Sequence, residues 1–388
     1  MRKIFLILFL VLFLIGLSYT KKAKPKVSLA STHVKTAIER VSEQKLREYL
    51  TNLTDNDDIA GPDQKQTRYS PYNGEKGKPR GNRVEAEYIK SHFDSLGLES
   101  SFQDFTVGGA GTRNIIGRIK GRKENEVYIL TSHMDSTAAM SGTNNPAPGA
   151  DDNGSGTVLV MESARVLKSL GVSFEYSLEF IAFSGEEQGL IGSYYYVDHI
   201  PQGKVVKGVI NVDMVGYGPN SECVNFYYWP NTGSNILTSK ILEVNSKYNI
   251  ELNIRTGSST NGRSDHAAFG YAGKPAAFGY ECGINNNPTY HSVQDTMDKI
   301  NFSQLTKTAK AVAGALVELA NAESLPSPNT PTPGGPTTTN SPGIPPTTPT
   351  ATPVLPAPTS KLYNCYPDPK CSSGQKNIQL CPLICYPK

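Results

Sequence analysis

Short apolar segments alternate with segments of helical periodicity through the middle of the chain, and this alternation constrains the fold more than any other feature. Strands are predicted at 127–131, 178–183 and 209–213, and helices at 157–170, 191–199, 234–248 and 302–321. Strands separated by helices form mostly parallel sheets that carry helices on both faces. We therefore predict an α/β fold with a mostly parallel central sheet, in which ligands bind beyond the carboxyl ends of the strands.

A segment rich in proline and threonine divides the chain. Residues 326–358 contain 12 prolines, 9 threonines and no charged residue. Such a composition cannot bury a core and favours an extended spacer. We predict a linker over 324–360, between a large domain at 21–323 and a small module at 361–388. Residues 21–55 contain helical stretches and are either a removable propeptide or an N-terminal helix packed on the large domain.

The first twenty residues have the pattern of a secretory signal. Arg2 and Lys3 precede an apolar run at 4–17, and small or polar residues follow up to Thr20. The run is short for a hydrocarbon core of about 30 Å, so we expect a cleaved signal peptide at 1–20 and no stable membrane insertion. An uncleaved anchor is the alternative. Sequons at Asn52 and Asn301 are consistent with a secreted, extracellular glycoprotein.

Four of the six cysteines lie in the last 24 residues, at Cys365, Cys371, Cys381 and Cys385. In an oxidising compartment such a cluster predicts two local disulfides, for which three pairings are open. The spacing does not match paired zinc knuckles. We predict a disulfide-rich C-terminal module that tethers the protein to polysaccharide, cell wall or another protein. The alternative is an end that merely resists proteolysis.

The charge distribution argues against nucleic acid as a partner. The total net charge is +3, of which the leader carries +2 and the C-terminal module +3, so residues 21–360 carry −2. Proteins that bind nucleic acid concentrate basic residues on one face, and this body has no such excess.

Carboxylates and histidines gather where the predicted strands end. His133 and Asp135 follow the first strand, the Glu186–Glu187 pair follows the second, and Asp213 ends the third. An aspartate pair at 151–152 precedes a helix, and a second histidine lies at 291. Two imidazoles with three carboxylates suit two zinc ions that share one bridging carboxylate. A further carboxylate could then take a proton from an activated water. Taken alone, Asp135 and Asp213 could be turn or cap residues, and the Asp151–Asp152 pair is more typical of a turn than of a site.

Five motifs in order give this chain a family resemblance. They are SHMDS at 132–136, GADDNGSG at 149–156, SGEEQGLIGS at 184–193, NVDMVG at 211–216 and TYHS at 289–292. Over about 28–323 the chain resembles the secreted di-zinc aminopeptidases of the bacterial leucine-aminopeptidase and fungal secreted types. The resemblance implies two zinc ions per chain and removal of N-terminal residues from peptide or protein substrates.

The resemblance also implies roles for individual residues. Asp152 matches the bridging metal ligand, with His133 and Asp213 completing one metal site, and Glu187 and His291 completing the other. Asp151 is then the member of its pair that binds no metal.

Further roles follow in the same way. Glu186 matches the general acid/base, and Asp135 the carboxylate that orients a metal-bound imidazole. Tyr290 matches a tyrosine that hydrogen-bonds the tetrahedral intermediate. Arg263 lies in a segment that resembles part of the substrate pocket, and His266 in the same segment is expected to be structural.

Several alternatives stay open. A carboxypeptidase or dipeptidase of the same fold is the second interpretation, followed by a glutaminyl cyclase and by a catalytically inactive binding scaffold. Cys223 and Cys282 either form a disulfide that braces the loop before His291 or remain unpaired.

Overall fold

A computed structural model describes residues 29–54, 83–141, 147–218, 222–284, 287–324, 363–367 and 383–387. The chain divides into two units, Met1–Leu325 and Pro326–Lys388. The predicted signal peptide, most of the predicted linker, and Cys371 and Cys381 lie outside the described residues. Among the described residues no helix combines the length and apolar composition needed to cross a membrane.

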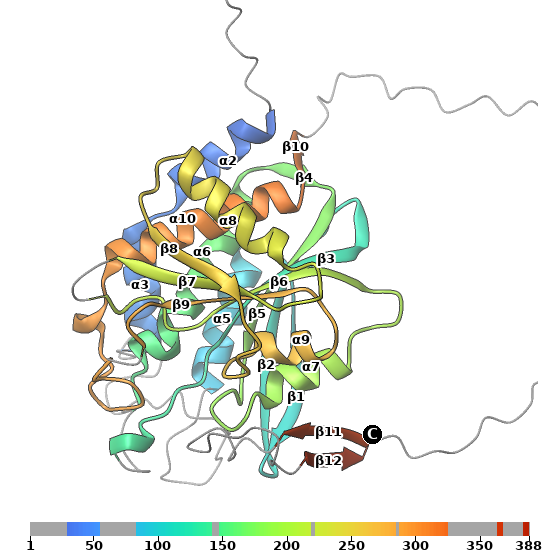
Figure 1. The fold of residues 1–388 in the computed structure, drawn as a ribbon, viewed down its shortest axis with the longest axis vertical. Coiled ribbons are helices and arrows are strands. Elements are labelled where there is room, and N and C mark those ends of the chain that lie inside the picture. The colour runs from blue at the N-terminus through green and yellow to red at the C-terminus, as the bar shows by residue number, and fades with distance from the viewer. Residues whose placement is uncertain are drawn as a thin grey trace, which may run out of the picture. The chain divides into compact units, whose positions relative to one another are not determined.

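An eight-stranded sheet forms the centre of the first unit (Figure 1). Its strands, in spatial order, are β1 (Glu99–Val107), β2 (Ala110–Ile119), β5 (Tyr176–Phe183), β3 (Lys123–His133), β6 (Val205–Val212), β9 (Ala276–Glu281), β7 (Cys223–Tyr228) and β8 (Asn253–Ser258). Strands β5, β3, β6 and β9 are parallel to their neighbours in this series, and β8 is parallel to β7. The pairs β1–β2, β2–β5 and β7–β9 are antiparallel. The predicted mostly parallel sheet is confirmed.

Helices cover both faces of this sheet (Figure 1). One face carries α2 (Leu29–Arg40), α3 (Glu43–Thr54), α5 (Arg83–Ser95), α6 (Gly156–Ser169), α8 (Asn235–Lys247) and α10 (Phe302–Leu319). The other carries α7 (Ile191–Asp198) and α9 (His266–Tyr271). Adjacent residues of a strand enter opposite cores, as Ile129 and Leu130 of β3 do, because side chains alternate along a strand. A short pair, β4 (Val172–Phe174) and β10 (Ala322–Ser324), lies apart from the main sheet.

The N-terminal helices belong to the core of the first unit. Val34 of α2 and Leu46 and Leu50 of α3 are fully buried. Between the two helices, the backbone N–H of Ser42 donates to the buried carboxylate of Glu162 in α6 at 2.7 Å. The predicted propeptide boundary near residue 55 falls just after α3, outside the described residues.

The second unit is described only at two strands. β11 (Tyr363–Pro367) pairs antiparallel with β12 (Leu383–Pro387), and this register places the backbones of Cys365 and Cys385 opposite each other. The predicted disulfides and tethering role of this module stay predictions.

Candidate metal centre

The order of three adjacent strands brings the first group of site residues together. β3 lies between β5 and β6 and runs parallel to both. His133 is the last residue of β3, the Glu186–Glu187 pair follows the end of β5, and Asp213 follows β6 directly. Because parallel strands end at the same edge of a sheet, these side chains converge there.

A tight turn before α6 supplies Asp152. Residues Ala150–Ser155 form this turn, and the Asn153 side chain fastens it to the end of β6 by donating from Nδ2 to the Val212 carbonyl at 2.9 Å. The Gly156 N–H donates to Asn153 Oδ1 at 2.9 Å. A Cβ at position 156 would lie 2.2 Å from that oxygen and 2.5 Å from the Val212 carbonyl. Glycine is therefore required where α6 begins.

The five predicted metal ligands form two groups that share Asp152. In the first group His133 Nε2 lies 3.4 Å from Asp152 Oδ1 and 3.2 Å from Asp213 Oδ1. In the second, His291 Nε2 lies 3.0 Å from Asp152 Oδ2 and 3.1 Å from Glu187 Oε2. Within each group the potential ligand atoms lie within 4.8 Å of one another. Each oxygen of Asp152 thus faces a different histidine, which is the arrangement expected of a bridging carboxylate.

The donor atoms fit divalent cations such as zinc. The Glu187 side chain is 4% exposed, yet its Oε1 has no hydrogen-bond partner in the described part of the chain. His133 and Asp152 are also buried. Buried charges are normally paired or coordinate a metal, and mixed imidazole and carboxylate ligands suit zinc. These residues therefore fit a bound divalent metal ion.

The pKa values of these side chains reflect an excess of negative charge at the site. Burial raises the pKa of Glu187 to about 7, and the nearby Asp152 carboxylate adds to this increase. Burial alone would lower the pKa of His291, but hydrogen bonds to Asp152 and Glu187 raise it to about 10. Without a metal the imidazole therefore carries the compensating positive charge, which a bound cation would replace.

Glu186 and Glu187 are held by Asp135. Its two carboxylate oxygens accept the backbone N–H groups of Glu186 at 3.3 Å and of Glu187 at 3.2 Å. Its backbone oxygen lies 3.0 Å from His133 Nδ1, whereas the carboxylate lies 3.8 Å from that nitrogen. The expected contact with the imidazole is thus made by the main chain, and the side chain positions the two glutamates. Burial, together with the charges of Glu187 and Asp213, raises the pKa of Glu186.

Tyr290 contacts one ligand of this group, and Arg263 precedes a residue that contacts another. The Tyr290 ring stacks on His291 with centroids 3.7 Å apart, and the side chain is partly exposed. Burial and the neighbouring carboxylates raise the Tyr290 pKa, so its hydroxyl stays protonated and can donate. Arg263 is exposed and precedes Ser264, whose hydroxyl donates to Asp213 Oδ2 at 2.7 Å. The neighbouring His266 is buried and stacks on Phe278.

Sequence reasoning missed a layer of polar residues behind the ligands. Asp295 accepts the backbone N–H groups of Asp151 and Asp152, both at 2.9 Å. Asp151 binds none of the site histidines and instead accepts the Gly216 N–H at 2.8 Å. Glu281 is fully buried beside Asp151, and this burial raises its pKa to about 12. No sequence pattern distinguishes Asp295 or Glu281 from other acidic residues of a turn or a strand end.

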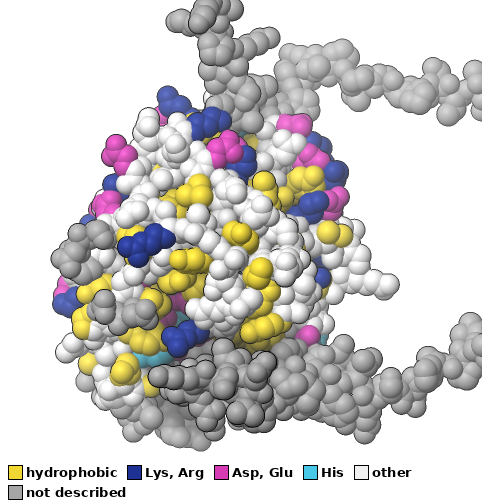
Figure 2. All heavy atoms as spheres, viewed as in Figure 1, with side chains coloured by type: hydrophobic (Ala, Val, Ile, Leu, Met, Phe, Trp, Pro, Cys, Tyr) yellow, Lys and Arg dark blue, Asp and Glu magenta, His cyan; other side chains and the backbone are white. Residues whose placement is uncertain are grey.

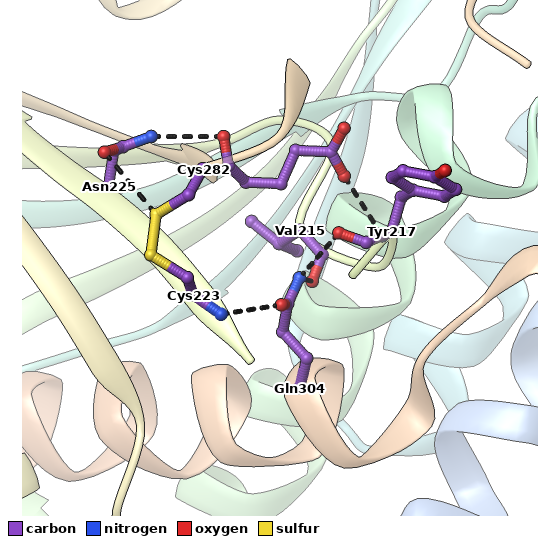
Figure 3. Close-up of a disulfide and its surroundings, with 7 residues drawn as sticks. Val215, Tyr217, Cys223, Asn225, Cys282 and Gln304 are labelled. Carbon is purple, nitrogen blue, oxygen red and sulfur yellow. Dashed lines mark hydrogen bonds between the residues drawn. A yellow bond between two sulfur atoms is a disulfide. The ribbon is translucent and has the colours of Figure 1, made fainter. Parts of the chain in front are cut away.

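A disulfide joins Cys223 at the start of β7 to Cys282 just after β9 (Figure 3). The buried Gln304 of α10 accepts the Cys223 N–H through its side-chain oxygen at 2.9 Å. Its amide nitrogen donates to the carbonyls of Val215 and Tyr217. The structure thus contains the predicted disulfide and not two unpaired thiols. Through Gln304 the disulfide is connected to the chain that follows Asp213.

Comparison with known proteins places this site in a family. Residues 114–316, which include all five predicted metal ligands, match the profile of Peptidase family M28. The chain belongs to peptidase family M28. A probable leucine aminopeptidase of Arthroderma otae supports this assignment, with 30% identity over 78% of this chain and 79% of the relative.

Two other relatives align with this M28 chain over a smaller share of both sequences. Leupeptin-inactivating enzyme 1 of Streptomyces exfoliatus is 31% identical over 63% of this chain and 57% of its own length. A probable leucine aminopeptidase of Arthroderma benhamiae is 36% identical over 52% of this chain and 56% of its own length. The chain thus spans little more than half the length of these two curated relatives.

Solved structures share the fold of this M28 chain. The LapA aminopeptidase of Legionella pneumophila matches with a TM-score of 0.61 and 25% identity, over 78% of each chain. A zinc aminopeptidase of Bacillus subtilis matches with a TM-score of 0.58 and 19% identity, over 72% of this chain and 95% of the other. The likeness to the Bacillus protein concerns the fold alone.

Proposed function

We propose that this chain is a secreted metallo-aminopeptidase that removes N-terminal residues from peptides and proteins with a water activated by two zinc ions. One observation carries the proposal. The two oxygens of Asp152 face two different histidines, and each histidine contacts one further carboxylate, Asp213 or Glu187. The two groups of ligands therefore share one carboxylate, which suits a two-metal centre.

Each protein group then has a definite task. Zinc bound to these two sets would lower the pKa of a coordinated water and polarise the scissile carbonyl. The Glu186 carboxylate accepts the proton of the attacking water and returns it to the leaving amine. The Tyr290 hydroxyl donates a hydrogen bond to the substrate oxygen as negative charge develops there. Arg263 contacts the substrate from the exposed loop after β8.

The named relatives favour an aminopeptidase over other peptidases. Two relatives are named as probable leucine aminopeptidases, and the matching Legionella structure is described as an aminopeptidase. A site crowded with carboxylates also suits a substrate that carries a free ammonium group. We therefore assign the free N-terminus of a peptide, rather than its C-terminus, to this site.

The experiment compares leucyl anilide with its N-acetylated form on the purified full chain. We expect cleavage of the free-amine substrate alone, loss of cleavage with 1,10-phenanthroline, and recovery when zinc is restored. Zinc content measured in parallel should be two ions per chain.

Other outcomes point to specific alternatives. A folded, zinc-loaded protein that cleaves neither anilide would contradict aminopeptidase action and direct assays to carboxypeptidase, dipeptidase and glutaminyl cyclase substrates. A folded protein that binds no zinc would instead support an inactive scaffold.

Export and the C-terminal module form a separate part of the proposal. The leader and the Cys223–Cys282 disulfide support an oxidising, extracellular location. On the face shown in Figure 2, Lys and Arg side chains are interspersed with Asp and Glu rather than gathered, which suits peptide better than nucleic acid as a partner. Deletion of residues 324–388 should abolish adsorption to insoluble glycans or cell walls if the module is a tether; unchanged adsorption would contradict that role.

A further inference from the structure

His291 is the one predicted metal-binding histidine that no strand or helix holds. It lies in a segment of turns between β9 and α10, and its backbone φ is +52°. This left-handed conformation is uncommon for residues other than glycine. Such a conformation persists when surrounding contacts hold it. The contacts on either side of His291 therefore decide where its imidazole lies.

Asn287 makes the contact on the N-terminal side. Its Nδ2 donates to Asp151 Oδ2 and to Glu281 Oε1, both at 3.2 Å. Its Oδ1 accepts the Thr289 backbone N–H at 3.0 Å and the Thr289 hydroxyl at 2.7 Å. All four residues are buried, so water does not compete for these hydrogen bonds. One amide thus connects the turn that leads to His291 with the residue that precedes Asp152.

Asp295 makes the contact on the C-terminal side. It accepts the backbone N–H groups of Asp151 and Asp152 through its carboxylate, and its own carbonyl accepts the Ala150 N–H at 3.0 Å. The segment that carries His291 is therefore fastened at both ends to the segment that carries Asp152. The 3.0 Å contact between His291 Nε2 and Asp152 Oδ2 lies between these two attachments, and the His291 carbonyl also accepts the Met140 N–H at 3.0 Å.

The other half of the centre is built differently. His133 belongs to β3, where it is in register with Phe183 of β5, and Asp213 directly follows β6 and donates its N–H to Gly279 of β9 at 2.9 Å. The sheet itself therefore positions both ligands. None of the hydrogen bonds of Asn287 reaches this half of the centre within the described residues.

We propose that Asn287 is a positioning residue that sets the zinc affinity of the Glu187–His291 half of the centre and leaves the His133–Asp213 half unaffected. This inference rests on the two-zinc centre proposed above. Residues that orient metal ligands typically contribute about 10- to 100-fold to metal affinity. The loss of Asn287 should therefore affect one zinc ion and not the other.

The test measures zinc affinity in two backgrounds, each of which keeps one half of the centre. His133→Ala leaves the Glu187–His291 half, and His291→Ala leaves the His133–Asp213 half. Asn287→Ala is introduced into each full-length variant, and zinc affinity is measured by competition with a chromophoric chelator. We expect about 10- to 100-fold weaker binding in the first background and unchanged binding in the second. The absorption spectrum of bound Co²⁺ should change in the first background only.

Asn245→Ala is the matched control. Asn245 also joins two segments through both ends of its amide, since Nδ2 donates to the Leu252 carbonyl and Oδ1 accepts the Leu252 N–H, but it lies at the end of α8. We expect it to lower the thermal unfolding temperature without weakening zinc binding in either background. Asn287→Ser keeps an acceptor for the Thr289 N–H and repeats the test with less damage to the turn.

Three results would overturn the inference. They are equal weakening in both backgrounds, unchanged binding in the His133→Ala background, and no zinc binding at all by a folded His133→Ala protein. Failure of the proposed function is seen separately, in the zinc content and anilide cleavage of the unmodified chain.

Discussion

The Oδ2 atom of Asp135 accepts the backbone N–H of Glu187 at 3.2 Å. Its Oδ1 accepts the N–H of the preceding residue, Glu186, so one buried carboxylate fixes both the proposed base and a proposed zinc ligand. The same residue contacts His133 through its backbone oxygen. Asp135 therefore connects the end of β3 to the turn after β5.

Replacement of Asp135 by asparagine should disturb this connection. An amide offers one acceptor oxygen instead of two, so one of the two buried N–H groups loses its partner at a cost of about 1–3 kcal/mol. We expect kcat/KM to fall by about 10- to 100-fold. The midpoint of urea unfolding should shift to a lower urea concentration. The exposed Asp94→Asn variant serves as the control, because Asp94 pairs with Lys90 on the surface of α5. Full activity in Asp135→Asn would contradict the role.

Glu186→Gln should separate proton transfer from metal binding. The amide cannot accept the proton of the attacking water, and loss of a general base typically costs about 10²- to 10⁴-fold in rate. We expect kcat to fall by this amount with zinc content unchanged, measured by metal analysis and anilide hydrolysis. Glu187→Gln should instead lower zinc content. An active Glu186→Gln enzyme would exclude Glu186 as the base.

The buried His266 should make the free energy of unfolding depend on pH. Burial lowers the pKa of this imidazole to about 3, from 6.5. Between these values the unfolded chain binds a proton that the folded protein does not, so the free energy of unfolding falls as the pH drops. The loss between pH 7 and pH 5 should be about 2 kcal/mol from this group.

The measurement compares urea unfolding of the wild type and of His266→Gln at both pH values. Glutamine retains a donor for the Asn261 carbonyl, which His266 contacts at 2.7 Å, but does not titrate. The contributions of other titrating groups cancel in the difference between the two proteins. If the difference in the free energy of unfolding between the two proteins stays constant from pH 7 to pH 5, His266 is not buried in its neutral form.

The Cys223–Cys282 disulfide should stabilise the fold. The two residues are 59 positions apart, and closing a loop of this length in the unfolded chain is worth about 4 kcal/mol in the entropic account. Replacing both cysteines by serine should lower Tm by roughly 5–10 °C, measured by calorimetry on the zinc-loaded protein. The wild type treated with reductant should show a similar decrease. An unchanged Tm in the serine variant would contradict a stabilising role.

The sequence by itself determined the central architecture and the ligand types. Short apolar strands alternating with segments of helical pattern are a local property of the chain, and they predict the parallel strands β3, β5 and β6 together with α6, α7, α8 and α10. The clustering of carboxylates and histidines at the strand ends could also be predicted, because the ends of parallel strands meet at one edge of the sheet. Strands β1 and β8 were missed because their largely exposed side chains leave only a weak apolar pattern.

Only the tertiary structure decided which residues hold the ligands in place. Asn287 and Asp295 come from a segment of turns and Glu281 ends β9, and all three depend on hydrogen bonds to Asp151 and Asp152, far away in the chain. The second role of Asp135 likewise depends on the position of the turn after β5. Such contacts follow from how separate segments pack, because a buried polar group must find its partner wherever the fold places one.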